Sequence, residues 1–405
     1  MTLTVLRLSA QEHDEFVRAH PNGHLMQMSA WGREKEHTGW TWQTVAVGHP
    51  AGGERTTPEV TGVALILFRR TPVLPMALAY VPRGVVADWS DSATLDILLA
   101  EVSRVAKANR GVLLRLDPAI DITDPHARSA LESRGFTRTD PGDNPAKNLA
   151  QPATRMITDI SDLEDLHARL AKGTRWSIRK AERSGVVYES VGREQIPIFH
   201  DLLRDTAERG GFTTRSLEYF TTLMDVLGPT DEIIVSLVRL DPAVALASAQ
   251  KIRDDLSTQL DKARAKPESE KRNRQIDSLE TELASAQNSV AEVEALQQAD
   301  PDGPYLAGSV FAINGTRGSY LYAASSDEHR NVYPSYLMVW NLMQKAAERG
   351  VTSFDFGGID AADGLEEFKR KWEPERREYI GEFSKRLRPL TGRLIELAVS
   401  LYKRR

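Results

Sequence analysis

Basic side chains recur along one face of a predicted helix near the middle of the chain. Arg175, Arg179 and Arg183 are spaced at i, i+4 and i+8, so they share a face, and Lys172 and Lys180 lie close to them. Two interpretations fit this stripe. It contacts the phosphate backbone of a nucleic acid, or it is a solvated helix face.

Two tyrosines form a second group with chemical potential. Tyr320 and Tyr322 alternate along a predicted strand, so both are expected on the same side of a sheet. In that position they line a ligand cleft or fill a core.

The residue types exclude several other mechanisms. The chain has no cysteine, which removes disulfides, thiolate metal sites and a cysteine nucleophile. Its nine histidines lack metal-ligand spacing, and no Ser, His and Asp form a nucleophile-elbow motif. We therefore expect no metal, no cofactor and no covalent intermediate. We also find no Arg/Gln-x-x-Gly-x-Gly/Ala loop of the kind that binds the pyrophosphate of coenzyme A.

Length and composition indicate a folded protein with more than one domain. The chain has 405 residues, of which 41% are hydrophobic and 27% charged, so we expect two lobes and an insertion. The net charge of −5 argues against bulk electrostatic coating of nucleic acid. No secretory signal or membrane-spanning stretch is present in the sequence, which predicts a cytoplasmic protein.

Strand and helix patterns repeat in the two halves of the chain. Each half is expected to contain a β-hairpin, a helix and a further strand. In the first half these are strands 44–47 and 62–68, helix 93–108 and strand 112–116; in the second they are strands 232–240, 305–313 and 319–324, helix 334–349 and strand 351–356. Two similar mixed α/β lobes follow, one at 1–150 and one at 151–241 plus 301–384, with the stretch 140–152 as a linker.

Residues 242–300 predict a helical hairpin inserted into the second lobe. In its second helix an apolar seam is spaced in steps of three and four, as in a coiled coil, and a rougher seam marks the first. The seams are Ile276, Leu279, Leu283, Ala286, Val290 and Val293, and Leu246, Ala249, Ile252, Leu256, Leu260 and Ala263. Pro267 separates them. The narrow seam favours a projecting arm, roughly 35 to 45 Å long at 1.5 Å per residue, over two helices that lie on the globular body.

The end of the chain is basic. Residues 385–405 carry seven basic residues and one acidic residue, with apolar positions at helical spacing. A terminal helix packed on the first lobe is one interpretation. A peripheral contact with anionic lipid and a contact with RNA phosphates are the others.

Several ordered segments resemble one enzyme family. The segments 354–359 (FDFGGI) and 364–369 (GLEEFK) are similar to the signature of the FemABX aminoacyl-tRNA-dependent peptidyltransferases. Segments 174–181 (TRWSIRKA), 209–212 (RGGF) and 320–326 (YLYAASS) also look like family segments, in the family's order, and the helical hairpin lies where family members carry their arm. The resemblance implies two lobes of the acyl-CoA N-acyltransferase (GNAT) type.

This resemblance also implies a reaction and two substrates. An amino acid such as glycine, alanine or serine would pass from aminoacyl-tRNA to the stem-peptide amine of a peptidoglycan precursor, either lipid II or a UDP-linked muropeptide. The Phe368–Lys369 pair matches the family's catalytic position, where a cation would stabilise the developing oxyanion. Without the resemblance, Lys369 would be interpreted as a solvated lysine in the basic run 369–371. Here the residues that follow, Arg370 to Trp372, depart from the family's small residues.

The resemblance further assigns binding residues. Lys35 and Arg215, supported by Thr213 and Tyr219, match positions that grip the precursor's diphosphate, for which charge-assisted hydrogen bonds suit Lys and Arg. For the two groups described first, both interpretations stay open. Tyr320 and Tyr322 line the precursor cleft or are core aromatics, and the stripe of Arg175, Arg179, Lys180 and Arg183 contacts the tRNA acceptor stem or is a solvated helix face.

Two other functions remain open at this stage. A tRNA-dependent enzyme of secondary metabolism would use the same fold and donor on a small-molecule acceptor. A non-catalytic tRNA-binding scaffold would use only the arm and the basic tail.

Overall fold

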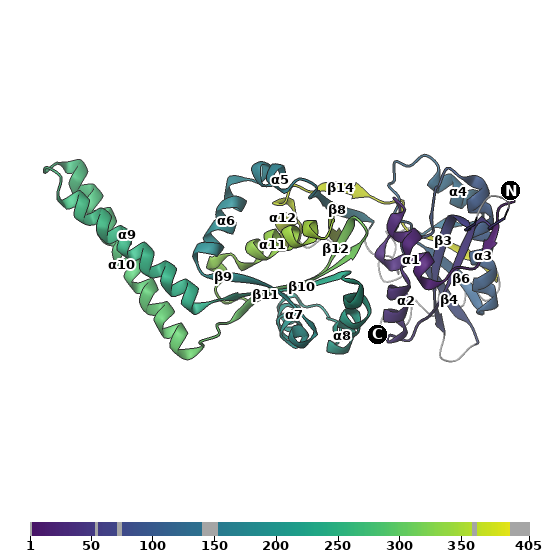
Figure 1. The fold of residues 1–405 in the computed structure, drawn as a ribbon, viewed down its shortest axis with the longest axis horizontal. Coiled ribbons are helices and arrows are strands. Elements are labelled where there is room, and N and C mark those ends of the chain that lie inside the picture. The colour runs from purple at the N-terminus through teal and green to yellow at the C-terminus, as the bar shows by residue number, and fades with distance from the viewer. Residues whose placement is uncertain (1, 53–55, 71–74, 140–152, 359–362, 389–405) are drawn as a thin grey trace.

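The molecule consists of two α/β lobes and a helical arm arranged in a row (Figure 1). The structure, a computed structural model, describes residues 2–52, 56–70, 75–139, 153–358 and 363–388. No helix within these ranges is long and apolar enough to cross a membrane. The predicted linker 140–152 lies outside them.

The first lobe is built on a mixed sheet with strand order β1-β2-β3-β4-β6-β15-β7, and β5 pairs with β3. Helix α3 begins after Asp91, whose carboxylate accepts the backbone N–H of Thr94. The elements are β1 (Thr4–Leu6), α1 (Ala10–Ala19), α2 (Ser29–Glu36), β2 (Thr41–His49), β3 (Glu59–Arg70), β4 (Ala77–Val81), β5 (Val86–Ala87), α3 (Ser92–Ala108), β6 (Gly111–Leu116), α4 (Ala127–Ser133), β7 (Thr137–Arg138) and β15 (Phe383–Arg386).

The second lobe has a sheet with strand order β14-β8-β13-β12-β11-β10-β9. Its elements are β8 (Thr154–Asp159), α5 (Leu163–Arg169), α6 (Lys172–Arg183), β9 (Val186–Val191), α7 (Ile196–Gly210), α8 (Leu217–Leu227), β10 (Ile233–Leu240), β11 (Tyr305–Asn314), β12 (Arg317–Ser325), α11 (Pro334–Glu348), β13 (Ser353–Gly358), α12 (Asp363–Arg370) and β14 (Glu375–Glu378). Helices α6 and α11 pack on one face through one apolar core, and α7 and α8 cover the other face, where their core continues into the first lobe (Figure 1).

The expected repeat of strand, helix and strand is present in both lobes. In the first lobe α3 connects β4 to the parallel strand β6, and in the second α11 connects β12 to the parallel strand β13. The two-lobed mixed α/β fold predicted from the sequence is therefore confirmed. The repeats differ in how far the parallel strands pair, a difference that matters for the site below.

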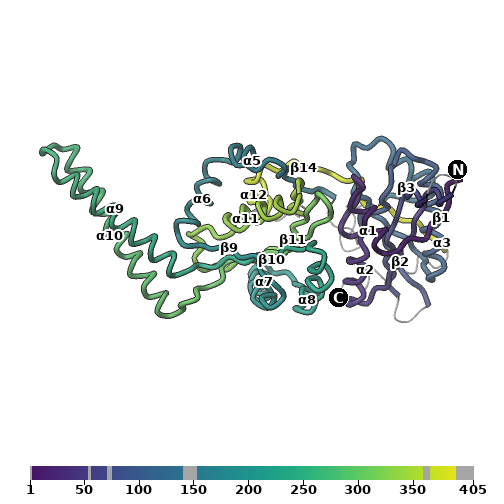
Figure 2. The backbone as a smooth tube through the Cα atoms, viewed as in Figure 1, coloured from purple at the N-terminus to yellow at the C-terminus, as the bar shows by residue number. Residues whose placement is uncertain are grey.

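The predicted helical hairpin consists of α9 (Pro242–Arg264) and α10 (Glu270–Ala299), which project away from both lobes (Figure 2). Leu260, Ala263 and Leu279 form its apolar core near the tip. One predicted seam residue is wrong: Ile252 is 47% exposed. The seam position between Ala249 and Leu256 is occupied by the partly buried Arg253. The sequence pattern favoured Ile252 because it is apolar.

The end of the described chain corrects the predicted terminal helix. Lys385 and Arg386 belong to strand β15, which pairs with Leu113 and Leu114 of β6. Phe383, predicted in the second lobe, also pairs within the first sheet. The chain thus returns to the first lobe before the predicted boundary at residue 384. The remainder of the predicted helix, 389–405, lies outside the described residues.

Polar contacts and a shared apolar core join the two lobes. The Arg18 guanidinium of α1 lies 2.6 Å from the Glu232 carboxylate. Arg317, at the start of β12, donates to the carbonyl oxygens of His20 and Pro21 at 2.9 and 2.8 Å. Gly315 in the β11–β12 turn has φ +58, and a Cβ there would approach the Arg18 carbonyl to 2.6 Å. The turn therefore requires glycine to fit against the first lobe.

Candidate functional site

Two elements from different lobes bring Lys35 and Tyr219 together. Lys35 lies in the last turn of α2, and its Nζ is 2.8 Å from the Glu34 carboxylate, whose side chain is 1% exposed. The same ammonium lies 4.2 Å from the ring centroid of Trp31 and 5.2 Å from that of Tyr219. The Trp31 and Tyr219 rings shield the Lys35 ammonium from water, and the negative faces of the rings attract its positive charge.

Arg215 and Tyr322 complete this group, which we call the Lys35 cluster (Lys35, Arg215, Tyr219 and Tyr322). The Arg215 guanidinium carbon lies 5.6 Å from the Tyr219 ring centroid, and the Tyr322 hydroxyl is 3.2 Å from that of Tyr219. Ser216 caps α8 by accepting the Tyr219 N–H, which fixes the start of the helix next to Arg215. Thr213 is exposed on the loop between α7 and α8.

Burial changes the acid–base properties of the cluster. Removal from water lowers the pKa of Lys35 from its usual value; Glu34 opposes this effect and the Arg215 charge adds to it. Burial also raises the pKa of the Tyr219 hydroxyl well above its usual value. The cluster therefore places the protonated Tyr219 phenol beside the basic side chains of Lys35 and Arg215, an arrangement that offers hydrogen-bond donors to an anionic ligand.

The prediction that Tyr320 and Tyr322 face the same side is wrong. Phe311 pairs with Tyr320 and Val310 pairs with Tyr322, so Leu321 is an additional residue in β12. This bulge reverses the alternation. Tyr322 packs on Phe220 of α8 at 4.9 Å between ring centroids, whereas Tyr320 packs on Phe356 at 5.8 Å on the opposite face. Only Tyr322 joins the Lys35 cluster, and burial raises the pKa of Tyr320 well above its usual value.

In the sheet of the second lobe, strands β12 and β13 separate part of the way along their length. Strands β12 and β13 pair at three positions only, the last being Ser319 with Asp355, although β12 continues to Ser325 and β13 to Gly358. The equivalent strands of the first lobe pair along the whole of β4. The pair β12 and β13 therefore has a gap in its hydrogen-bonded ladder that the pair β4 and β6 lacks, and this gap lies between Tyr320 and Gly357.

Lys369 lies beside this opening on the face opposite the Lys35 cluster. Its side chain is 6% exposed, and Nζ donates to the Gly358 carbonyl at 2.6 Å. Gly357 has φ +87, a backbone conformation that residues with a side chain rarely adopt, and it lies next to the lysine: a Cβ there would be 4.0 Å from the Lys369 Nζ. The Asp355 carboxylate accepts the Gly357 N–H at 2.7 Å and pairs with Arg155, which fixes the turn.

Phe368 and Trp372 hold α12 in place. The Phe368 ring packs edge-on against Tyr336 at 5.3 Å, and Trp372 is fully buried. Thr158 of β8 donates to the Trp372 carbonyl at 2.9 Å. The bulky Trp372, which departs from the family's small residues, therefore fills the core beneath Lys369. Ile359 and Asp360 of the sequence motif lie outside the described residues.

The basic stripe on α6 lies on the same face as Lys369. Arg179 and Arg183 are exposed, while Arg175 and Lys180 are half-buried. The Thr174 hydroxyl is 3.5 Å from the Lys371 carbonyl, which connects α6 to the end of α12. The residues predicted from the sequence thus form two groups on opposite faces of the second-lobe sheet: the Lys35 cluster on one face, and Lys369 with the α6 stripe on the other.

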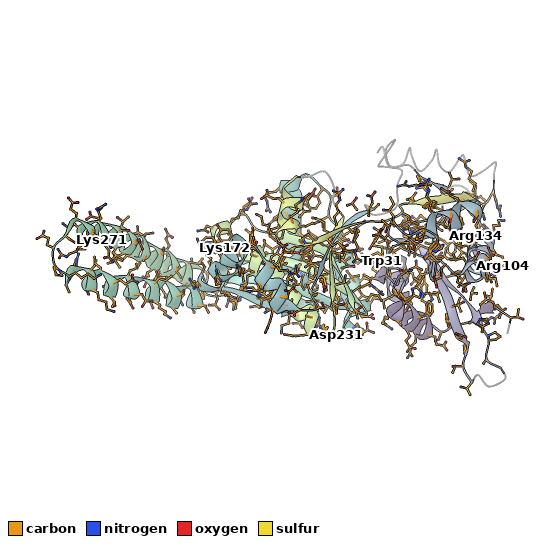
Figure 3. All side chains as sticks on the ribbon, turned by 90° about the horizontal axis from the view of Figure 1, so that it is seen from above. Trp31, Arg104, Arg134, Lys172, Asp231 and Lys271 are labelled. Atoms are coloured by element: carbon orange, nitrogen blue, oxygen red, sulfur yellow. The ribbon has the colours of Figure 1, made fainter. Side chains whose placement is uncertain are left out.

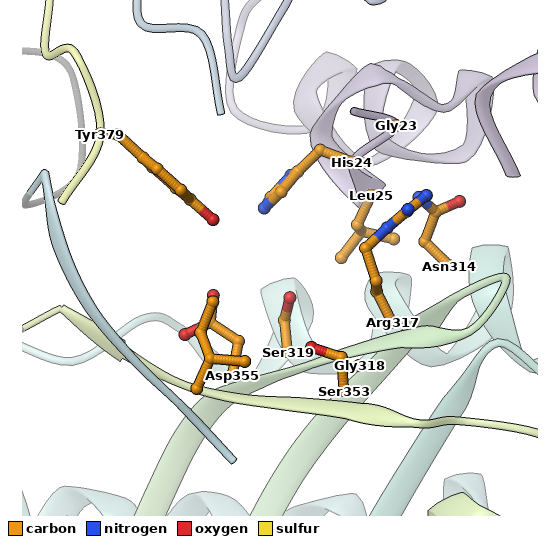
Figure 4. A pocket seen from close by; sticks show the side chains of 11 residues that line it. Gly23, His24, Leu25, Asn314, Arg317, Gly318, Ser319, Ser353, Asp355 and Tyr379 are labelled. Carbon is orange, nitrogen blue, oxygen red and sulfur yellow. The ribbon is translucent and has the colours of Figure 1, made fainter. Parts of the chain in front are cut away.

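A small pocket between the lobes was not predicted from the sequence (Figure 4). His24 and Tyr379 point into it from one side and Ser319 and Asp355 from the other, and Arg317 lines its edge. Burial lowers the pKa of His24 well below its usual value, and nearby arginines add to this shift, so the imidazole is neutral. Packing between the lobes creates the pocket, and no local sequence pattern marks it.

Within the described residues no cluster of His, Asp and Glu could hold a metal ion.

Comparisons with known proteins agree with this architecture. A sequence model of the FemAB family matches residues 8–400. A lipid II:glycine glycyltransferase of Staphylococcus aureus is 33% identical over 407 residues, which cover 96% of this chain and 94% of the relative. The crystal structure of FemX superimposes with a TM-score of 0.84 at 32% identity, covering 97% of this chain and 99% of that one.

Proposed function

Because the chain belongs to the FemAB family, we propose that it transfers an amino acid from aminoacyl-tRNA to the stem-peptide amine of a peptidoglycan precursor. The amino acid is glycine, alanine, serine or a similar residue. The lipid II:glycine glycyltransferase that resembles this chain over almost its full length supports the acceptor class. The observation that carries the proposal is the placement of two basic side chains, Lys35 and Arg215, and of the buried Lys369 on opposite faces of the sheet, which opens between β12 and β13.

The Lys35 cluster is the proposed acceptor site. Lys35 comes from the first lobe and Arg215 from the second, so a ligand that bridges them is held at the junction between the lobes. A diphosphate offers the charge and the oxygen acceptors that these two cations require. The same chemistry is present in lipid II and in a UDP-linked muropeptide, and both are acceptors to be tested.

Lys369 and α6 form the proposed donor side. Attack of an amine on an aminoacyl ester requires a neutral amine and stabilisation of the tetrahedral oxyanion. The Lys369 ammonium, held by the Gly358 carbonyl, supplies a fixed positive charge beside the opening. The acceptor amine would enter from the Lys35 cluster, and the ester from the α6 face.

The direct test is a transfer assay. A pool of radiolabelled aminoacyl-tRNAs is incubated with the enzyme and with lipid II or UDP-linked pentapeptide, and label in the acceptor is measured. We expect incorporation that ribonuclease treatment of the donor abolishes. Incorporation into neither acceptor would exclude the proposed reaction.

Replacing Arg215 or Lys35 with alanine is expected to raise the KM for the precursor by roughly tenfold or more, since each charge-assisted hydrogen bond contributes about 1.5–3 kcal/mol. The KM for aminoacyl-tRNA should not change. Arg193→Ala is the matched control, because Arg193 is an exposed arginine between β9 and α7 that pairs with Asp225 of α8. Equal precursor KM values in all four proteins would remove the cluster from the acceptor site.

Precursor binding should weaken at alkaline pH in a way that depends on Lys35. Burial lowers the Lys35 pKa, so its ammonium is charged below that pKa and loses its proton before an ordinary lysine of pKa about 10.4 does. As pH rises through this range, the precursor KM of the wild-type enzyme should rise relative to that of Lys35→Arg, which stays protonated. KM measured at several pH values gives this ratio, and a constant ratio would contradict the assignment.

A further inference from the structure

Helix α6 connects the arm to the segment that carries Lys369. At its C-terminal end, Ser248 of α9 donates to the Arg183 carbonyl, and Asp241 at the arm base donates its N–H to Gly185 at 2.9 Å. At the N-terminal end, Thr174 donates to the Lys371 carbonyl. Figure 3 places Lys172, the first residue of α6, between the arm and the body of the second lobe. A partner that contacts α6 is therefore directed toward Lys369.

An exposed aromatic side chain interrupts the basic stripe. Trp176 is 49% exposed, which is unusual for a residue of its size. Its ring meets Tyr333 edge-on at 5.3 Å between centroids. The Lys180 ammonium lies 5.3 Å from the Trp176 centroid and 5.6 Å from that of Tyr333. We call Trp176, Lys180 and Tyr333 the α6 aromatic platform.

The platform is continuous with the packing around Lys369. Tyr333 contacts Tyr336 at 5.8 Å between centroids, and Tyr336 contacts Phe368 at 5.3 Å. Phe368 directly precedes Lys369 in α12. Three ring contacts thus lead from an exposed tryptophan to the neighbour of the reactive lysine.

We propose that the α6 aromatic platform binds the unpaired 3′ end of the aminoacyl-tRNA, with a base stacked on Trp176 and the phosphates contacted by the α6 arginines. This inference rests on the proposed donor. Aromatic side chains interleaved with cations bind single-stranded nucleic acid, because every base offers a face for stacking and every phosphate a charge. Helix α6 carries five basic residues and one acidic residue, Glu182, so its charge complements RNA.

The order of the ring contacts indicates which nucleotide the platform would hold. Tyr333, Tyr336 and Phe368 lead from Trp176 to Lys369. A base on Trp176 would therefore belong to a nucleotide upstream of the terminal one, whose ester reaches Lys369. The platform orients the donor, and its members are positioning residues rather than catalytic ones.

The test compares Trp176→Ala with Trp176→Phe, which keeps an aromatic ring. Binding of deacylated tRNA is measured by filter retention, with the intact RNA and with the same RNA trimmed of its unpaired 3′ nucleotides. The wild-type protein should bind the intact RNA roughly tenfold or more tightly than the trimmed one. Trp176→Ala should lose this difference, and Trp176→Phe should retain most of it. The KM for aminoacyl-tRNA should rise by a similar factor in Trp176→Ala, with the precursor KM unchanged.

The two proposals fail in distinguishable ways. Equal wild-type affinity for the intact and trimmed RNA, or an undiminished difference in Trp176→Ala, overturns the platform even if transfer from aminoacyl-tRNA is observed. If the Trp176-dependent difference is present but the wild-type enzyme transfers nothing, the platform stands and the proposed reaction fails. A thermal melt of Trp176→Ala close to that of the wild type confirms that the variant is folded.

Discussion

Lys369→Met is expected to lower kcat for transfer by about 100- to 1000-fold, the loss found when one donor to a developing oxyanion is removed. Methionine retains much of the length of the lysine side chain in its nearly buried site but cannot supply the positive charge. Binding of tRNA and of the precursor should be unchanged, because both proposed binding surfaces lie on other elements. Single-turnover transfer and separate binding assays measure the two effects.

Arg370→Ala is the control for this variant. Arg370 follows Lys369 in the same helix, but it is exposed and pairs with Glu366, so its loss should leave kcat nearly unchanged. An unaltered kcat in Lys369→Met would show that the lysine only supports the turn at Gly358. Loss of kcat with retained tRNA binding would also exclude a purely non-catalytic scaffold.

Trp372→Ala is expected to lower the free energy of unfolding by about 3–5 kcal/mol, the cost of truncating a buried large aromatic side chain. Trp372 is fully buried, contacts Phe368 and Tyr336, and carries the carbonyl that Thr158 binds. Because α12 is anchored at this residue, kcat should fall as well. Urea denaturation monitored by circular dichroism gives the stability, and the transfer assay gives kcat.

Trp372→Phe separates packing from any specific role of the indole. It keeps most of the buried volume and should cost much less stability than alanine. An alanine variant as stable as the wild type would contradict the proposed anchoring of α12. Trp176→Ala, at an exposed tryptophan, provides the opposite control and should change stability by less than about 0.5 kcal/mol.

Local periodicity was sufficient to predict much of the fold. Helix α3 and strands β3, β6, β10 and β11 agree with the predicted elements to within a few residues, because their apolar patterns extend over several turns of helix or a whole strand. The hairpin was predicted from its seam, although Ile252 was placed in it because an apolar residue was preferred over the correctly spaced Arg253. The family prediction is confirmed over residues 8–400.

Features that depend on long-range pairing could not be predicted. The bulge at Leu321 changes which face Tyr320 occupies, and nothing in the alternating sequence marks it. Strand β15 has too few residues for a pattern and forms only because β6 offers an edge. His24 and Tyr379 meet through packing of the lobes.

The candidate site was predicted in part. Lys35, Arg215, Tyr219 and Tyr322 were named from the family resemblance, and the structure brings them together. Their role in binding the precursor, like that of Lys369 in transfer, stays a prediction. The sequence marks Trp176 only as part of the segment 174–181, because its exposure and its contact with Tyr333 depend on the three-dimensional fold.

Strand β15 also determines when the sheet of the first lobe can be completed during synthesis on the ribosome. Phe383 pairs with Leu116, which is 267 positions earlier in the chain, and β7 is attached to the first sheet only through β15. At a synthesis rate of about 5–20 residues per second, the edge of β6 stays unpaired for roughly 13 to 50 s while the second lobe and the arm are synthesised. An unpaired edge is a site for association with other chains, so the edge of the nascent first lobe stays exposed until β15 has emerged.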